Sequence, residues 1–289
     1  CARYKLTIDE RLELFMQVCH AVHHAHQKGI IHRDIKPSNI LVSTSDDLAT
    51  PKIIDFGVAK ALAQPLTERT LITEQGQLFG TPEYMSPEQA DMAGEDIDTR
   101  TDVYSLGVLL YVLLTGVLPF ESKKLRESGI ENVRKIIRQI DPKTPSTRLT
   151  KLGQDAKKIA EKRRTEVTSL VRCLHRELEW IPLKAIRKER DQRYRSASEL
   201  ADDIENYLNG APLIAGPVTA IYRLKKFVRR HKVGVAAGAV VALALVLGCQ
   251  VNGDSFSLTV KSPTQVPLQE SDIWQALETI RQPDFFSTE

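Results

Sequence analysis

The fold of this 289-residue chain is decided by one polar stretch, His32-Arg33-Asp34-Ile35-Lys36-Pro37-Ser38-Asn39. Pro37 lacks a backbone N–H and cannot continue a helix, so the stretch is predicted to be a loop. The apolar residues 40–42 that follow are typical of a short strand. A turn over residues 43–50 and a second strand over 52–54 then lead to Asp55-Phe56-Gly57, where the glycine permits a sharp change of backbone direction.

Helices are predicted on both sides of these strands. Residues 9–28 carry apolar side chains at spacings of three and four and stop at Gly29, which indicates an amphipathic helix. Residues 103–114 are apolar on nearly every side, so this helix is expected to be buried. Ser196-x-x-Glu199 predicts a capping box at the start of a last helix. Residues 80–88 contain two prolines, which predicts a functional loop without regular helix.

Composition and charge exclude several classes of protein. With 42% apolar and 27% charged residues, the chain is neither disordered throughout nor a polytopic membrane protein. Its net charge of +3 gives no reason to expect nucleic acid as a partner. Four widely spaced cysteines indicate neither a zinc site nor a disulfide framework. Four histidines crowd the expected helix over 9–28 without an acidic or cysteine ligand, so we interpret them as ordinary helix residues.

Three motifs occur together in a fixed order. His32-Arg33-Asp34-x-Lys36-x-x-Asn39 is followed by a strand that ends in Asp55-Phe56-Gly57, and then by Ser86-Pro87-Glu88. By these motifs the chain resembles the eukaryotic-type serine/threonine protein kinases, and its membrane-proximal sequence looks like the bacterial receptor-like branch. The resemblance covers about residues 1–210. It implies an α+β, protein-kinase-like fold, mainly the α-helical C-lobe, followed by a single transmembrane helix.

The resemblance also assigns chemical roles. Asp34 would orient the acceptor hydroxyl and take its proton, and Lys36 would offset charge on the transferred phosphoryl group. Asn39 and Asp55 would share the magnesium ions that bridge the phosphates, because hard oxygen ligands suit magnesium. Lys36, Leu41 and Asp55 would contact ATP, with Leu41 as the floor beneath the adenine ring. The implied cofactors are therefore ATP and Mg²⁺.

Further residues are assigned to substrate choice and regulation. Lys36 two positions after Asp34, together with Thr81, matches the serine/threonine pattern, so the acceptor is expected to be a protein Ser or Thr. Thr81 would position that substrate. Arg33 would bind a phosphate on the activation loop, with Thr73 favoured as its site and Thr70 second.

Three residues are expected to support the architecture of the site. Glu88 and Arg193 would form the family's buried ion pair, which holds the activation segment to the helical lobe. Asp102 would anchor the backbone of the loop near His32.

The Gly-rich loop, strand lysine and helix glutamate with which a kinase N-lobe binds the nucleotide are missing from this sequence. No G-x-G-x-x-G occurs, and residues 1–8 leave no room for a five-stranded lobe. We therefore expect a fragment that begins after the hinge and lacks the N-lobe, inactive alone but part of an autophosphorylating membrane signalling kinase. The alternative is a naturally truncated, inactive binding module that docks partners through residues 121–177, which hold sixteen bases and eight acids. A small-molecule phosphotransferase is disfavoured, because residues 80–88 would have no purpose there.

A membrane anchor is expected near the C-terminus. Residues 233–249 carry no charge. As a helix they would span roughly 26 Å, or roughly 29 Å with the next two residues, against about 30 Å for a bilayer core. Residues 211–232 form a basic juxtamembrane linker and residues 252–289 an acidic stub. The positive-inside rule therefore places the kinase lobe in the cytoplasm, the single-pass helix at 233–251, and the tail outside. Gly234-x-x-x-Gly238 permits close helix approach, which leaves a homodimer open, and a buried helix is the alternative to a membrane span.

Overall fold

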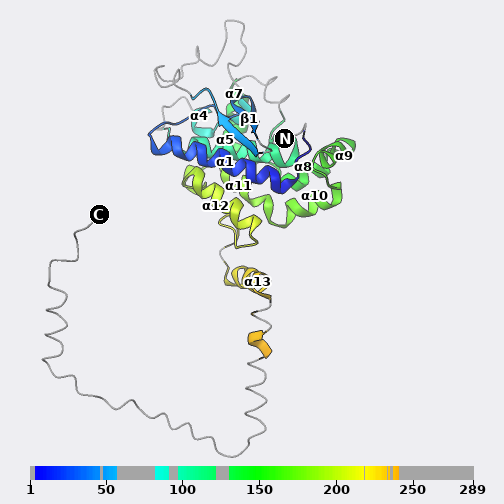
Figure 1. The fold of residues 1–289 in the computed structure, drawn as a ribbon. Helices are drawn as coiled ribbons and strands as arrows, with labels where there is room; N and C mark the ends of the chain where they lie inside the picture. The colour runs from blue at the N-terminus through cyan, green and yellow to red at the C-terminus, as the bar shows by residue number, and fades with distance from the viewer. Residues whose placement is uncertain are drawn as a thin grey trace, which may run out of the picture. The chain divides into compact units, whose positions relative to one another are not determined.

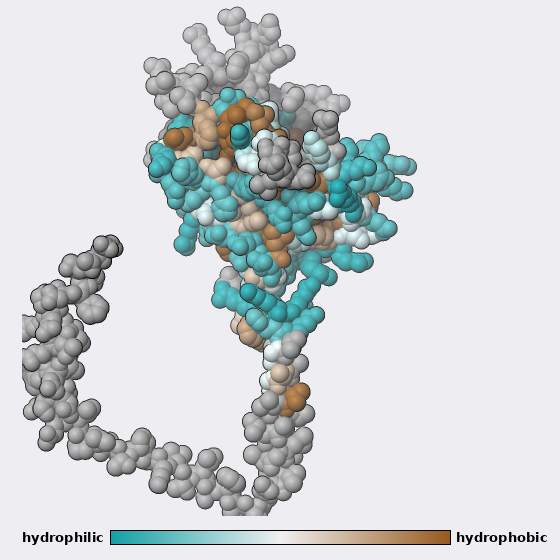
Figure 2. All heavy atoms as spheres, in the orientation of Figure 1, coloured by the Kyte–Doolittle hydropathy of each residue, from teal (hydrophilic) through white to brown (hydrophobic). Residues whose placement is uncertain are grey.

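The computed structural model describes residues 4–45, 48–56, 82–90, 97–121, 130–217, 219–232, 234 and 237–240. The chain divides into two compact units, residues 1–232 and 233–289. The first unit is a mainly helical lobe with one small sheet (Figure 1). Hydrophilic residues cover much of its surface in the view of Figure 2, with apolar patches between them.

The lobe contains long helices near its centre and shorter ones around them. The described α-helices are α1 (Ile8–Gln27), α4 (Pro87–Ala90), α5 (Arg100–Thr115), α7 (Ile130–Gln139), α8 (Pro145–Thr150), α9 (Gln154–Glu161), α10 (Val167–Cys173), α11 (Trp180–Ala185), α12 (Ala197–Leu208) and α13 (Ala220–Arg230). A π-helical segment, Leu174–Leu178, joins α10 to α11. Short 3₁₀ helices occupy Pro37–Asn39, Pro82–Tyr84 and Arg190–Gln192.

The core is built around α5. Leu106, Leu110 and Leu114 lie on this helix and are fully buried, in a cluster that also contains side chains of α1 and α12. Helix α1 packs along α12, and α5 packs along α11. Gly107 allows the second approach, because a Cβ atom there would lie 2.5 Å from the Cβ of Ala185. The predictions of an amphipathic helix over 9–28 and a buried helix over 103–114 are confirmed.

The sheet has two antiparallel strands, β1 (Ile40–Ser45) and β2 (Leu48–Ile53), paired from Ile40 with Ile53 to Ser45 with Leu48. The predicted turn over residues 43–50 was therefore wrong, because most of it is strand. Thr44 and Thr50 are β-branched and suit extended backbone. Pro51 is tolerated because a two-stranded sheet contains only edge strands.

Two helix starts show which capping signals operate. Thr7 and Glu10 form a complete capping box at α1. At α12 the Ser196 hydroxyl accepts a hydrogen bond from the backbone N–H of Glu199, but the Glu199 carboxylate accepts from the N–H of Arg195. The capping box predicted at Ser196 is thus only half formed.

Helix α4 was not expected, because residues 80–88 were predicted to contain no regular helix. Pro87 is the first residue of α4, a position where the missing N–H costs nothing. Ser86 and Gln89 complete its start. The N–H of Ser86 donates to Oε1 of Gln89 at 3.1 Å, and the N–H of Gln89 donates to the Ser86 hydroxyl at 3.3 Å.

Two buried arginines close the ends of α5 and α9. Arg11 donates to the carbonyl oxygens of Leu113 and Lys162, and Arg163 donates to those of Leu113 and Ile159. A cation at a helix C-terminus is favourable, because the carbonyls there lack partners and carry partial negative charge. Burial lowers the pKa of Arg163 to about 10, and the neighbouring Arg11 adds to the effect.

Beyond α12 the chain continues into α13, the last helix of the first unit. Among the residues that the structure describes, no helix is both long and apolar enough to cross a membrane. Most of the membrane segment predicted at 233–251 lies outside the described residues, as does all of the stub at 252–289.

Candidate active site

The carboxylate of Asp34 is held through one of its two oxygens. Lys36 Nζ donates to its Oδ2 at 2.8 Å, and Asn39 Nδ2 lies 3.4 Å from the same oxygen. No described residue donates to Oδ1, and the Asp34 side chain is 30% exposed. Asn39 also donates to the backbone carbonyl of Asp34 at 2.9 Å. One carboxylate oxygen is therefore fixed in place, while the other has no hydrogen-bond donor among the described residues.

Asp102, at the start of α5, fixes the backbone of the same loop. Its two carboxylate oxygens accept hydrogen bonds from the backbone N–H groups of His32 and Arg33, both at 2.8 Å. His26 Nε2 donates to Oδ2 at 2.8 Å, from the adjacent α1. The Asp102 side chain is fully buried. A buried carboxylate is stable only when hydrogen bonds replace water, and here three donors do so.

His32 is fixed in one orientation by two bonds of opposite kind. Its Nε2 donates to the carbonyl oxygen of Ile54 at 3.0 Å, and its Nδ1 accepts from the N–H of Asp34 at 3.3 Å. A carbonyl can only accept and an amide N–H can only donate, so the proton is on Nε2. The ring also lies against Phe56, with 4.8 Å between centroids. His32 thus joins the loop to the end of β2.

Asn39 and Asp55 lie at the same end of the sheet. The N–H of Ile54 donates to the carbonyl of Asn39 at 3.0 Å, and Asp55 is the next residue. The Asn39 amide nitrogen donates to Asp34, and its side-chain oxygen accepts a hydrogen bond from the Ser38 hydroxyl at 3.3 Å, which leaves this oxygen one further lone pair for a ligand. Asp55 is exposed, and no described residue contacts its carboxylate through a hydrogen bond. Two such oxygens fit magnesium, which prefers hard oxygen ligands.

The backbone is strained on both sides of this site. Arg33 has a φ of 65° and Asp55 a φ of 58°, in the left-handed region that residues with a side chain rarely adopt. Such strain persists only where the surrounding structure fixes it, and it is common at functional sites. Gln89 supplies part of that restraint at Arg33, since its Nε2 donates to the Arg33 carbonyl at 2.7 Å.

The remaining predicted site residues are only partly visible. Leu41 lies on β1 and is 54% exposed, so its side chain is available to a ligand. Thr70, Thr73 and Thr81 lie outside the described residues.

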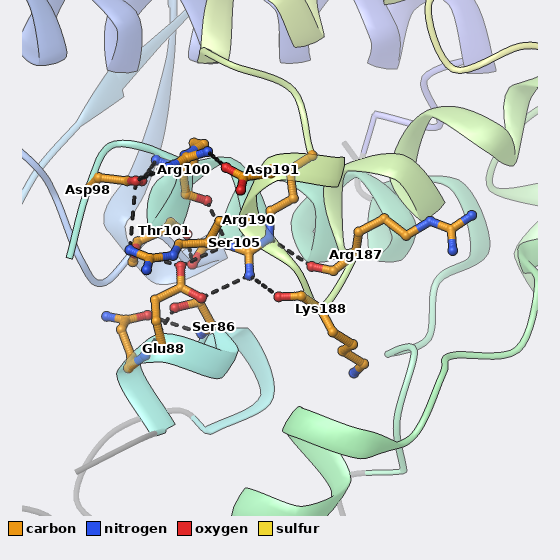
Figure 3. A network of polar contacts seen from close by, with 12 residues as sticks. Ser86, Glu88, Asp98, Arg100, Thr101, Ser105, Arg187, Lys188, Arg190 and Asp191 are labelled. Atoms are coloured by element: carbon orange, nitrogen blue, oxygen red, sulfur yellow. Dashed lines mark hydrogen bonds and ion pairs between the residues drawn. The ribbon is translucent and has the colours of Figure 1, made fainter. Parts of the chain in front are cut away.

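Glu88 and Arg193 form a buried, two-pronged ion pair, with 2.7 and 2.8 Å between their nitrogen and oxygen atoms. Figure 3 shows the Glu88 carboxylate and the carbonyl oxygens of Arg187 and Lys188 around one guanidinium group, which is that of Arg193. Arg193 also donates to the carbonyl of Arg100, so all five of its N–H groups have acceptors. Thr101 donates to the Glu88 carboxylate at 2.8 Å.

The ionised state of Glu88 is favoured despite its burial. Burial alone would raise the pKa of Glu88, but the hydrogen bonds and positive charge of Arg193 outweigh it and hold the pKa below its usual value. A more exposed group of charges borders this pair in Figure 3. There Arg100 contacts Asp98 at 2.7 Å and also Asp191. The first turn of α4 is thus bound to the lobe through Glu88, within a larger charge network.

Sequence reasoning missed two contributors to the site, His26 and Gln89. His26 was interpreted as one of four ordinary helix histidines, and nothing in the spacing of α1 separates it from the other three. Gln89 could have been found, because Ser86-x-x-Gln89 is a capping-box pattern that marks a helix start. Its second contact, to Arg33, joins residues 56 positions apart and has no local signal.

Comparison with known proteins gives consistent matches. Residues 2–178 match the family described as protein kinase domain. The chain is 34% identical over 207 residues to the serine/threonine-protein kinase PknB of Mycobacterium tuberculosis, covering 72% of this chain and 28% of that protein. It is 37% identical over 193 residues to PknB of Mycolicibacterium smegmatis, covering 67% and 25% respectively. The chain thus spans about a quarter of the length of these curated relatives.

A solved structure also matches. The crystal structure of the Mycobacterium tuberculosis PknI kinase domain is 22% identical, with a TM-score of 0.42, and the match covers 70% of this chain and 56% of that one.

Proposed function

The chain belongs to the protein kinase domain family, and on that premise we propose that it is the catalytic C-lobe of a serine/threonine protein kinase. The complete protein would transfer the γ-phosphoryl group of ATP to Ser or Thr hydroxyls of proteins. One observation carries this proposal. Asp34 has one oxygen bound by Lys36 and the other without a donor in the part of the chain that the structure describes, on a loop that Asp102 fixes through two backbone N–H groups.

The geometry suits the transfer step. The second carboxylate oxygen of Asp34 accepts a hydrogen bond from the acceptor hydroxyl. It then takes the proton of that hydroxyl, as the hydroxyl oxygen attacks the γ-phosphorus. The bond from the γ-phosphorus to the bridging oxygen breaks, and its electron pair leaves with ADP. Lys36, 2.8 Å from Asp34, is close enough to place its positive charge beside the group in transfer. Leu41 would lie beneath the adenine ring.

Asn39 and Asp55 are the residues that would hold magnesium. When bound, magnesium offsets the negative charge of the phosphate oxygens. The chain's own part is to keep these two ligands together, and the bond between the Ile54 N–H and the Asn39 carbonyl does this.

Substrate choice and regulation extend the proposal to residues beyond those described. Thr81 would shape the pocket for the residue after the target hydroxyl. Arg33 would bind a phosphate on Thr73, or on Thr70, and so order the activation loop after autophosphorylation. Arg33 is well placed for this because its backbone is held by both Asp102 and Gln89.

We also propose that residues 233–251 anchor the kinase in a membrane, with the lobe in the cytoplasm and residues 252–289 outside. The support is the uncharged stretch 233–249, with six bases and no acid over the 22 residues before it. Two copies of the chain would pair through Gly234 and Gly238, which lie in this same segment.

Asp34→Asn in the longest reading frame that contains this chain tests the proposed function. Asparagine keeps the size of the side chain but cannot accept the proton, so phosphate transfer to a generic protein substrate should be lost. Binding of a fluorescent ATP analogue should be retained. Asp202→Asn is the matched control, because Asp202 is an exposed acid on α12, and its activity should equal that of the parent.

The outcomes separate the proposal from its alternatives. Unchanged activity in Asp34→Asn would refute the role of Asp34. A parent protein that binds partners but transfers no phosphate would instead support the binding-module interpretation. Transfer to small molecules alone would support a small-molecule phosphotransferase.

A further inference from the structure

Helix α13 is attached to the lobe along one side only. The backbone N–H of Leu213 donates to the Tyr222 hydroxyl at 3.2 Å, and the Tyr222 ring lies 6.0 Å from that of Trp180. One turn further along, Lys226 forms an ion pair with Glu177 and is buried. Tyr222 and Lys226 therefore define the face of α13 that is turned toward the lobe.

The opposite face is apolar and exposed. Ile221, Leu224, Phe227 and Val228 recur at spacings of three and four, and their exposed fractions are 79%, 62%, 56% and 39%. With about 100° of rotation per residue, the centre of this face lies about 180° from the centre of the Tyr222 and Lys226 face. Large apolar side chains gathered on one exposed face mark an interaction site.

Positive charge borders the apolar face on both sides. Lys225 and Arg229 lie along one edge, and Arg223 and Arg230 lie along the other. All four are exposed, and no described acid forms an ion pair with them. Residues 211–232 contain no Asp or Glu at all. In Figure 2 hydrophilic residues predominate over α13 in the view shown.

The edge formed by Arg223 and Arg230 is also hollowed. A surface hollow of about 570 Å³ is lined by these two arginines together with Leu224, Phe227 and Pro212, and Lys226 also borders it. Apolar and cationic side chains thus line the hollow together. Such a hollow suits an anionic headgroup whose apolar part continues into a hydrocarbon layer.

We propose that α13 is an interfacial helix that lies flat on an anionic bilayer, with its apolar face among the acyl chains and its bases among the headgroups. A helix with an apolar face, basic flanks and low mean hydropathy binds bilayers in this orientation. Each base near an anionic surface adds attraction that salt screens. A nucleic acid would match the bases but would leave four large apolar side chains in water.

An α13 that lies on the bilayer sets the position of the lobe relative to the membrane. The uncharged stretch 233–249 begins three residues after the end of α13. The same helix that touches the headgroups is bound to α11 and to the π-helical segment through Tyr222 and Lys226. The inference rests on the proposed membrane anchor, and it adds that the lobe is held against the membrane surface rather than on a free tether.

Quenching of a tryptophan by brominated acyl chains tests this orientation. The full chain carries two tryptophans, Trp180 and Trp274. Trp274→Phe leaves Trp180 as a reference, because it contacts Tyr222 on the lobe-facing side. Phe227→Trp then adds a probe on the apolar face. Both chains are placed in nanodiscs of phosphatidylcholine and phosphatidylglycerol with brominated lipid.

The added tryptophan should be quenched at least about two-fold more strongly than Trp180, since only an interfacial position brings it among the acyl chains. The difference should shrink in phosphatidylcholine alone and at high salt. Replacing Arg223, Lys225, Arg229 and Arg230 by Gln should abolish it, while Lys226 stays in place to preserve its ion pair.

Alkaline carbonate extraction distinguishes failure of the interfacial helix from failure of the membrane anchor. Retention of the chain in the bilayer with equal quenching of both tryptophans would overturn the interfacial helix alone. Release of the chain by carbonate would overturn the membrane anchor and this inference with it.

Discussion

Gln89 donates a hydrogen bond from its side-chain amide to the backbone carbonyl of Arg33, with 2.7 Å between nitrogen and oxygen. Through its other amide atom it accepts from the N–H of Ser86 and closes the first turn of α4. One side chain therefore joins the start of α4 to the loop that carries Asp34. The contact also restrains Arg33 in its left-handed conformation.

Two substitutions separate these contributions of Gln89. Gln89→Glu keeps an oxygen for the Ser86 N–H but cannot donate to Arg33, and Gln89→Ala loses both contacts. Loss of a buried partner costs about 1–3 kcal/mol, so phosphate transfer by the complete protein should fall about tenfold in either variant. Initial rates at saturating ATP measure this. A Gln89→Glu protein with the parent's rate would show that the bond to Arg33 is irrelevant.

Replacement of Glu88 should destabilise the lobe strongly. Glu88→Gln leaves Arg193 as an unpaired buried charge, and the expected loss in free energy of unfolding is about 3–5 kcal/mol. Urea unfolding followed by far-UV circular dichroism measures it. The exposed Glu205→Gln on α12 is the control and should unfold like the parent.

The same pair gives a pH dependence with a defined sign. The pKa of Glu88 is lowered in the folded state, so its contribution is present above the ordinary glutamate pKa of about 4.3 and is lost as pH falls through the lowered value. The difference in stability between the parent and Glu88→Gln should therefore shrink in acid. A difference that stays constant from pH 7 to about pH 3 would contradict this account.

Lys188 should make the lobe more stable in mild alkali. Burial lowers the pKa of Lys188 to about 8, and its Nζ donates to the carbonyl of Ile137 at 2.6 Å. Between pH 8 and the ordinary lysine pKa of about 10.4, Lys188 is protonated in the unfolded chain and mostly neutral in the folded one. The free energy of unfolding therefore rises with pH in this range. The free energy of unfolding of the parent should show this slope, and Lys188→Met should lack it. The exposed Lys158→Met should keep the slope, and a parent without it would refute the effect.

Gly107→Ala should force α5 and α11 apart. The added Cβ would lie 2.5 Å from the Cβ of Ala185 and 2.7 Å from Cγ2 of Ile186, so the expected loss of stability is about 1–3 kcal/mol. Gly29→Ala is the comparison, because no atom lies within 4 Å of its added Cβ. Its positive φ alone should cost about 1–2 kcal/mol. A Gly107→Ala protein that melts at the same temperature as the parent would contradict the packing argument.

The sequence predicted those parts of the fold in which local pattern and tertiary packing agree. The helix expected over 9–28 is α1, and the one expected over 103–114 lies within α5, because apolar spacing and terminal glycines set both. The strands were predicted too short, since a run of serine and threonine resembles a turn until a partner strand is present. Helix α4 was missed because Pro87 suggested a break, whereas proline is well suited to a first helical position.

At the site, contacts between residues far apart in the chain were predicted only where the family resemblance supplied them, as for Glu88 and Arg193. The polar loop at 32–39 and the position of Asp55 could be predicted from the sequence, because each lies beside a predicted strand. His26 and Gln89 act through Asp102 and Arg33, residues 76 and 56 positions away, and neither contact leaves a periodic signal. The orientation of α13 could not be predicted either, because its basic and apolar residues alone do not reveal which face meets the lobe.

The partners in the Glu88–Arg193 pair lie 105 residues apart, which has a consequence for synthesis of the chain. At about 5–20 residues per second, a ribosome adds Arg193 about 5 to 20 seconds after Glu88. Helix α4 has four residues, too few to be stable alone. During that interval Arg193 is absent, so the ion pair that holds α4 to the lobe cannot form. Docking of α4 on the lobe is therefore completed only after translation has passed Arg193.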